Sequence, residues 1–271
     1  MNSITRTPLR VRHETRLRLV EVAEVEPISP LMRRITLQGE ALQGFTSAAA
    51  DDHVKLFFPA PGQAMPVLPV AGPDGPIYPE GAIRPSMRDY TPRRFDAANR
   101  ALVIEFVLHA TGPASDWAAQ AAPGQWLGVG GPRSSFLLPD DYNTYLFAGD
   151  ETALPAIARH LEELPPGARA LALIEVAGPL EERHLPTAAN ATIQWLHRGA
   201  TQAGRSTLLM QALKTLELPP GDTHAWLAGE IETVRAMRGY LIAEEAIPRA
   251  QIRAAGYWRL GQPATHARLD D

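Results

Sequence analysis

The 271-residue sequence contains no cysteine. Without thiolates, the chain has no residues with which to ligate an iron–sulfur cluster, build a cysteine-containing zinc site or form a redox dithiol. Any electron-transfer chemistry must therefore use an organic cofactor. A chain of this length can bury roughly three quarters of the surface that it exposes when unfolded, so we expect it to be stable without a disulfide or a structural metal.

Long apolar runs and an excess of basic residues are also missing. No run approaches the roughly 20 residues of a membrane span, and the N-terminal segment lacks the apolar stretch of a secretory signal. We therefore expect a cytoplasmic protein without a membrane partner. The formal net charge of −4 argues against nucleic-acid binding, which favours a basic balance. Local basic residues would have to attract any anionic ligand.

Short segments rich in β-branched and apolar residues fill the first half of the chain. They predict strands at residues 17–26, 32–39, 52–58, 89–95 and 101–108. The proline- and glycine-rich stretch 59–85 predicts a long surface loop instead of a sheet element. Short strands in series predict an antiparallel Greek-key barrel.

After Phe136, apolar strands alternate with segments of helical periodicity. Strands are predicted at residues 145–148, 171–176, 193–196, 225–228 and 252–260. A helical stripe follows the first of them, formed by Leu154, Ile157, Ala158 and Leu161. Ser206 is expected to cap the next helix. This alternation predicts a parallel sheet with crossover helices. We expect the boundary near residues 138–143, so that the domains comprise residues 1–140 and 141–271.

The first motif with chemical meaning opens the predicted strand 89–95. It contains Arg88, Tyr90, Thr91 and Arg93. Arginine presents a rigid fork to phosphate oxygens, and an aromatic ring with a neighbouring hydroxyl can face a flat heterocycle and its polar edge. The alternative is an exposed strand whose arginines are simply solvated.

A second motif follows about 20 residues later. It begins at His109 and continues through Gly112, Pro113, Ala114, Ser115 and Trp117. The glycine permits a tight turn and the proline suits the first turn of a helix, whose N-terminal amides can bind a pyrophosphate. The alternative is a capped helix with the tryptophan buried in the core.

Together, these motifs resemble the siderophore-interacting protein family. Three later segments agree in order, at residues 149–155, 226–230 and 256–261, so that the resemblance covers residues 15–261. It implies a FAD-containing ferric-siderophore reductase of the ferredoxin-reductase-like superfamily, active in iron acquisition, whose C-terminal segment returns to the flavin site. The first motif would contact the flavin and its pyrophosphate, His109 would lie near the isoalloxazine, and residues 112–115 with Trp117 would complete the FAD site. Ala110 departs from the glycine that relatives often carry.

The usual glycine-rich dinucleotide fingerprint is absent. Residues 128–131 resemble it only superficially, because Pro132 and Arg133 follow where a helix should start. The better candidate is a strand-to-helix segment formed by Gly149, Asp150, Glu151 and Thr152. Its two carboxylates would repel a close phosphate, and Asp150 or Thr152 could instead be a simple helix cap. The resemblance assigns this segment to the nicotinamide site, together with Ala228, Gly229, Glu230 and Trp258.

The choice of nicotinamide is weakly determined by the residues themselves. Arg183, His184 and Arg198 are candidate cations for a ribose 2′-phosphate, whereas Glu175 could favour a 2′-hydroxyl. The resemblance favours NADPH as the electron donor, with NADH as the alternative. It also implies that the flavin carries the chemistry, without a catalytic side chain or a resident metal.

The expected substrate is an anionic ferric siderophore or another ferric chelate. Three cations match the basic triad of family members that reduce ferric catecholates: Lys55, Arg133 and Arg259. Each taken singly could be an ordinary solvated side chain. Alternative functions are a flavin or ferredoxin-type reductase with a protein acceptor, or a non-enzymatic siderophore-binding module. A monomer is expected.

Overall fold

The computed structural model describes residues 9–73, 75–109, 112–262 and 267–268. Contacts within the chain divide it into two units. The first comprises residues Arg10–Phe136, and the second comprises Leu137–Asp271 together with Met1–Leu9. The division after Phe136 lies next to the boundary expected near residues 138–143.

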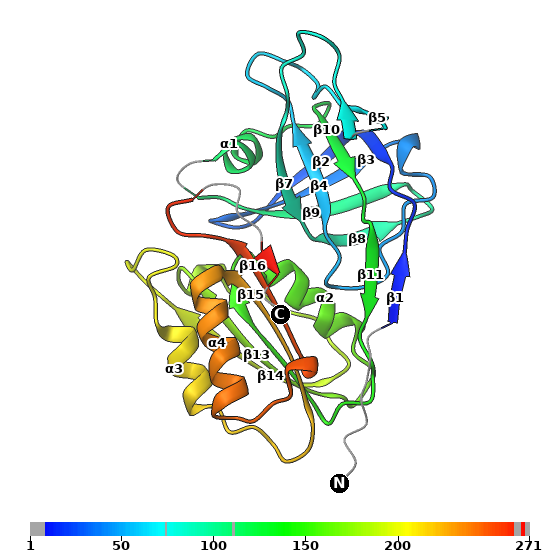
Figure 1. The fold of residues 1–271 in the computed structure, drawn as a ribbon. Helices are drawn as coiled ribbons and strands as arrows, with labels where there is room; N and C mark the ends of the chain where they lie inside the picture. The colour runs from blue at the N-terminus through cyan, green and yellow to red at the C-terminus, as the bar shows by residue number, and fades with distance from the viewer. Residues whose placement is uncertain (1–8, 74, 110–111, 263–266, 269–271) are drawn as a thin grey trace. The chain divides into compact units, whose positions relative to one another are not determined.

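The first unit is built around a curved, seven-stranded antiparallel sheet (Figure 1). In spatial order its strands are β7 (Ser86–Tyr90), β4 (Val54–Phe58), β10 (Trp126–Gly130), β2 (Leu17–Ser29), β3 (Met32–Gln38), β9 (Ala101–Val107) and β8 (Pro92–Asp96). The two edge strands, β7 and β8, are consecutive in sequence and only Thr91 separates them. The sheet therefore curls so that its edges meet at this residue, which confirms the predicted antiparallel barrel.

Two local predictions for this unit were wrong. The single strand predicted at 89–95 is broken at Thr91, because the chain passes there from one edge of the sheet to the other. The stretch 59–85 contains a paired hairpin, β5 (Val70–Gly72) with β6 (Gly75–Ile77), and is not loop alone. Both strands of a two-stranded sheet are edge strands. Such strands tolerate proline, which has no N–H to donate.

Alternating side chains of the sheet form the core of the first unit. Leu102, Ile104 and Phe106 of β9 are fully buried, and they pack with residues such as Val20 and Leu56. Helix α1 (Pro113–Ala119) packs against β4, β7 and β9. Two further strands, β1 (Leu9–Arg12) and β11 (Ser134–Leu137), pair with each other beside this sheet.

The second unit contains a six-stranded sheet (Figure 1). Its spatial order is β14 (Asn190–His197), β13 (Arg169–Val176), β12 (Thr144–Asp150), β15 (Thr223–Glu230), β16 (Ile252–Trp258) and β17 (Ala267–Arg268). The first five strands are parallel and β17 is antiparallel. This confirms the predicted parallel sheet. The order reverses between β12 and β15, and such a switch point is where open α/β sheets bind ligands.

Three α-helices of the second unit connect its strands: α2 (Leu154–Glu163), α3 (Leu208–Thr215) and α4 (Ile231–Ala243). The predicted stripe of α2 is buried at every position. Ser206 accepts a hydrogen bond from the Leu208 amide at 3.2 Å, although the capping position itself is Thr207. Three short 3₁₀ helices complete the described structure: η1 (Glu40–Leu42), η2 (Pro179–Glu181) and η3 (Arg249–Gln251).

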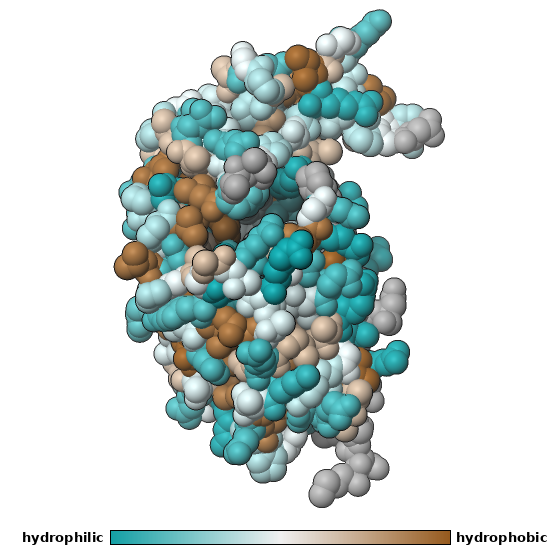
Figure 2. All heavy atoms as spheres, turned by 90° about the vertical axis from the view of Figure 1, so that its left-hand side faces the viewer, coloured by the Kyte–Doolittle hydropathy of each residue, from teal (hydrophilic) through white to brown (hydrophobic). Residues whose placement is uncertain are grey.

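No helix in the described part of the chain is both long enough and apolar enough to cross a membrane. On the face shown in Figure 2, hydrophobic residues occur as separated patches among hydrophilic ones.

Candidate functional sites

Strand β7 presents two of the predicted flavin-site residues. Arg88 and Tyr90 lie opposite Leu56 and Val54 of β4. The Tyr90 ring packs 4.5 Å from the Phe106 ring, centroid to centroid, and burial raises the pKa of Tyr90. Arg88 is partly exposed and donates to the Met87 carbonyl at 2.7 Å, with no carboxylate partner among the described residues. Its guanidinium therefore keeps donors available for an anion.

Arg93 differs from Arg88 because a buried carboxylate holds it. It lies on β8, with its Nε 3.7 Å from an oxygen of Glu105. The same carboxylate binds Arg34 at 2.8 Å and is fully buried. Thr91, between the two strands, is 6% exposed. The structure therefore places Thr91 and Arg93 where they stabilise the barrel corner, and their flavin contacts stay a prediction.

The loop before α1 is held in shape by Ser115. Its hydroxyl donates to the His109 carbonyl and accepts from the His109 amide, each at 2.8 Å. Gly112 has φ +150°, and a Cβ there would lie 3.0 Å from the His109 ring. No side chain caps the N-terminus of α1, which begins at Pro113. The glycine thus lets the imidazole and an uncapped helix terminus lie close together. Ala110 lies outside the described residues.

Trp117 is only 8% exposed and belongs to the core. Its ring packs 5.6 Å from Phe58 and 5.7 Å from Phe106, between centroids. Its location therefore agrees with the core alternative, and a direct FAD contact stays a prediction. Because α1 also packs against β7, the fold brings the two motifs together. An uncommitted guanidinium, an aromatic ring and an uncapped helix terminus fit the pyrophosphate and flat ring of FAD.

The predicted nicotinamide segments meet at the switch point of the second sheet. Gly149 of β12 pairs with Ala228 of β15. A Cβ on Gly149 would lie 2.3 Å from the Ala228 carbonyl oxygen, and one on Gly229 would lie 2.5 Å from Asp150. Only glycine permits this close approach, so the two strand ends form one compact surface. Such a position fits a nicotinamide dinucleotide.

Asp150 ties the ends of three strands together. One of its oxygens accepts from the amide and hydroxyl of Thr152, and the other accepts from the Glu230 amide at 2.9 Å and the Trp258 indole at 2.8 Å. Burial, with the nearby Glu151 charge, raises the pKa of Asp150 to about 6. The alternative that Asp150 or Thr152 caps α2 was wrong, because Ala153 occupies that position and no side chain caps the helix.

The carboxylates beside Asp150 are also paired. Glu151 binds Arg198 through two hydrogen bonds of 2.6 and 2.5 Å. Glu230 accepts from the Glu232 and Thr233 amides at 2.8 and 3.0 Å and so caps α4. The repulsion expected from Glu151 is thereby balanced by Arg198.

The residues suggested for nicotinamide selection have other partners. The Arg198 side chain is 7% exposed and committed to Glu151. Glu175 is buried, and that burial raises its pKa. Arg183 is partly buried and has contacts of its own, whereas His184 is exposed. Neither Glu175 nor Arg198 is therefore poised to discriminate between the ribose substituents.

The three predicted substrate cations differ in their partners. Lys55 donates to Asp89 at 2.6 Å, and Arg259 lies 3.3 Å from Glu232. Arg133 is exposed, with no carboxylate partner in the described part of the chain. Lys55 and Arg133 belong to the first unit and Arg259 to the second. Sequence analysis missed both carboxylate partners.

Comparison with known proteins identifies the chain. The sequence profile described as siderophore-interacting FAD-binding domain matches residues 21–136, and the profile described as siderophore-interacting protein matches residues 142–261. This protein belongs to the siderophore-interacting protein family. Membership confirms the resemblance inferred from the two motifs and the three later segments.

Individual family members match over almost the whole chain. An Escherichia coli NADPH-dependent ferric-chelate reductase is 40% identical over 95% of this chain and 99% of its own. The ferric vibriobactin reductase ViuB of Vibrio cholerae is 35% identical over 90% of each chain. The crystal structure of a siderophore utilization protein from T. fusca superposes with a TM-score of 0.88, at 40% identity, covering 95% of this chain and 98% of that one.

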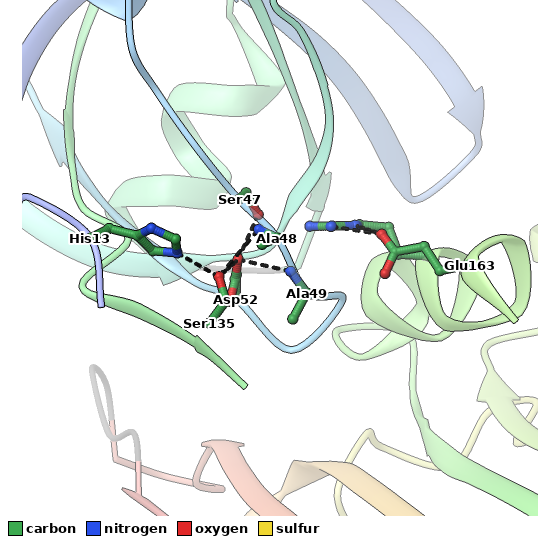
Figure 3. Close-up of polar contacts among 8 residues, drawn as sticks. His13, Ser47, Ala48, Ala49, Asp52, Ser135 and Glu163 are labelled. Carbon is green, nitrogen blue, oxygen red and sulfur yellow. Dashed lines mark hydrogen bonds and ion pairs between the residues drawn. The ribbon is translucent and has the colours of Figure 1, made fainter. Parts of the chain in front are cut away.

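A serine–histidine–aspartate network in the first unit was not predicted (Figure 3). The His13 ring and the Asp52 carboxylate each lie 2.7 Å from the Ser135 hydroxyl, which donates to Asp52. Hydrolases need the serine to donate to histidine, so this order does not activate Ser135 as a nucleophile. The residues are too far apart in sequence for a pattern to reveal them. Their contacts fix β11 and the segment before β2 to the loop before β4.

Proposed function

We propose that this protein is an NADPH-dependent, FAD-containing ferric-chelate reductase that converts Fe(III) in a siderophore or similar chelate to Fe(II). The observation that carries the proposal is the 40% identity, over 95% of the chain, to the Escherichia coli reductase of that description. The FAD-binding profile over residues 21–136 and the parallel sheet of the second unit support it.

In the first unit, we assign the FAD pyrophosphate to Arg88 and the N-terminus of α1. The Arg88 guanidinium has no carboxylate partner among the described residues, and no side chain caps α1, although the Gly112 amide donates to the Asp116 carboxylate at 3.4 Å. We assign the flavin ring to the neighbourhood of Tyr90 and His109. When bound, FAD supplies the conversion of a two-electron hydride donor into single-electron transfers. The chain's contribution is to hold the reactants and to exclude water, so no acid or base residue is required.

In the second unit, we assign NADPH to the carboxyl ends of β12 and β15. The close approach of Gly149 and Ala228 leaves backbone there for a ligand to contact. Asp150, Glu151 and Glu230 hold that backbone in place, since their carboxylates already accept from protein donors. NADH is the alternative donor.

We assign the attraction of an anionic ferric chelate to Arg133 and Lys55 in the first unit and, separately, to Arg259 in the second. Arg133 has the largest unused donor capacity, because Lys55 and Arg259 already contact carboxylates. A local positive charge is needed to draw an anion to a protein of net charge −4. We further propose that the protein works as a cytoplasmic monomer, without a nucleic-acid or membrane partner.

The decisive experiment records the visible spectrum of the purified protein, then adds NADPH without oxygen, followed by a ferric catecholate and a ferrous trap. We expect a flavin spectrum that bleaches with NADPH and recovers as trapped Fe(II) accumulates. Bleaching without recovery would indicate a protein acceptor. Failure to bind FAD after reconstitution would overturn the proposal and favour a binding module.

A further inference from the structure

The first unit contains a cavity of about 200 Å³ that the proposed reaction does not use. Its wall comes from the segment before β2, the start of β2 and two loops. It is lined by Arg12, His13, Glu14, Arg16, Arg18, Gly44, Thr46, Gly131 and Pro132. The charged groups of this lining are therefore three guanidinium groups and one carboxylate.

Arg18 is the unusual member of this group, because it is a buried cation with no carboxylate bound to it among the described residues. It is 4% exposed. Its Nη1 donates to the carbonyls of Arg16 and Gly131, both at 3.2 Å, and its guanidinium lies 5.4 Å from the centre of the Phe45 ring. Its Nε is buried and has no hydrogen-bond partner. Burial of an unpaired charge is costly, and a bound anion would offset that cost.

The remaining charges of the wall also favour an anion. Arg12 is exposed and has no ion pair within the described residues. Arg16 contacts Glu14 at 2.7 Å, and both side chains are more than half exposed. Burial and the neighbouring Arg16 lower the pKa of Arg18, but an arginine stays charged at neutral pH. The wall therefore carries a net positive charge.

The wall is held in shape by protein contacts. His13 is fixed by Ser135 at 2.7 Å, and Ser135 in turn by the buried Asp52 (Figure 3). The Gly131 amide donates to the Arg16 carbonyl at 3.3 Å. A site held in this way requires little reordering when a ligand binds.

The cavity lies apart from the residues assigned to FAD, but it borders Arg133, because Gly131 and Pro132 line it and the His13 amide donates to the Arg133 carbonyl at 3.0 Å. Arg18 lies on β2, and Arg88 lies on β7, with β4 and β10 between these strands. Three strand spacings correspond to about 14 Å along the sheet. Arg18 is two residues from Val20 along β2, so its side chain lies on the same, buried face of the sheet. Lys55 lies between the buried Val54 and Leu56, so its side chain points to the opposite face.

We propose that this cavity binds a phosphate-class oxyanion, either free phosphate or the phosphoryl end of a larger molecule, through Arg18, Arg12 and Arg16. Tetrahedral oxyanions accept several charge-assisted hydrogen bonds at once, which suits three guanidinium groups around a small space. This inference does not depend on the proposed reductase activity.

The test measures phosphate binding to the full-length protein with excess FAD, by calorimetry and by thermal unfolding against chloride of equal ionic strength. A ligand that binds only the folded state raises its melting temperature. We expect such a rise for the wild type and a loss of phosphate affinity of about tenfold or more in Arg12→Ala, from the removal of one charge-assisted contact. Arg94→Ala, an exposed arginine of the same unit, should bind phosphate like the wild type.

A second variant, expected to strengthen phosphate binding, distinguishes a binding role of these residues from a purely structural one. Glu14→Gln removes the single carboxylate of the wall and should tighten phosphate binding. Arg18→Met should also weaken phosphate binding. If this variant does not fold, the Arg12 and Glu14 variants, both of exposed residues, still test the proposal. Tighter binding of adenosine monophosphate than of phosphate, lost in Arg12→Ala, would identify a phosphoryl group of a larger molecule. Equal melting temperatures in phosphate and chloride, or equal losses in Arg94→Ala, would overturn the proposal.

Discussion

The candidate sites of the two units differ in whether their charged side chains already have protein partners. At the switch point of the second unit the carboxylates already have protein partners, since Asp150 accepts four hydrogen bonds and Glu151 is paired with Arg198. In the first unit Arg18, Arg88 and Arg133 have no carboxylate partner among the described residues. The switch point therefore uses its charges internally, whereas these three arginines retain donors for external anions, unlike Arg93 and Lys55 of the same unit, which contact carboxylates.

This difference teaches how each unit meets its ligand. Asp150 has its acceptor sites filled, so in the second unit it positions backbone at the strand ends and does not accept directly from NADPH. Uncommitted guanidinium groups can each form strong hydrogen bonds to phosphate or carboxylate oxygens. We therefore expect substitutions at the switch point to reduce stability first, and substitutions of the free arginines to reduce ligand binding first.

The largest effect is expected from Asp150→Asn. Asparagine keeps one acceptor oxygen but has an NH₂ group in place of the other. Two of the buried donors that Asp150 accepts from therefore lose their acceptor. Each loss costs about 1–3 kcal/mol, and we expect the free energy of unfolding to fall by about 2–4 kcal/mol. Urea unfolding measures this. Asp140→Asn, at an exposed carboxylate of the same unit, is the matched control, and equal small losses in both would contradict the assignment.

The same variant gives a pH test with a defined sign. Burial raises the pKa of Asp150 from 3.8 to about 6. Between these values the folded state binds more protons than the unfolded state, so the stability that this group contributes is full below pH 3.8 and is lost as pH rises through about 6. Asp150→Asn should lack this decline, and superimposable profiles for the two proteins would count against it.

The next effect is expected from Arg88→Ala. Loss of a charge-assisted contact of about 1.5–3 kcal/mol weakens FAD binding by roughly ten- to a hundredfold, measured by titration of flavin fluorescence. Arg94→Ala, an exposed arginine on β8, should leave FAD affinity unchanged. Arg93→Ala should instead lower stability, because Arg93 lies beside the buried Glu105. Equal FAD losses in Arg88→Ala and Arg94→Ala would contradict the assigned role.

Local periodicity predicted an antiparallel barrel followed by a parallel sheet. It predicted neither strand β10 nor the switch point, whose segments were assigned to the nicotinamide site from the family resemblance. The stripe of α2 depends only on neighbouring residues, so it could be predicted correctly. The break at Thr91 depends on barrel closure, which joins strands from opposite edges of the sheet.

The pairings of the charged groups depend on register between distant strands. Lys55 meets Asp89 only because β4 and β7 align at that level, and Glu151 meets Arg198 across 47 positions of sequence. Sequence could therefore name the charged residues of the sites. It could not show which of them are already neutralised.

The smallest effects are expected for two of the proposed substrate cations, Lys55 and Arg133. Asp89→Asn frees Lys55 from its partner at 2.6 Å, whereas Arg133→Ala removes a cation that has no carboxylate partner among the described residues. Exposed charge pairs contribute about 0.2–1 kcal/mol, so kcat/KM on a ferric catecholate should change by at most about fivefold, upward for Asp89→Asn and downward for Arg133→Ala. Added salt should shrink both changes. Rates on a neutral ferric chelate should stay constant, since an equal change there would mean that the variants disturb the flavin site and not the attraction of an anion.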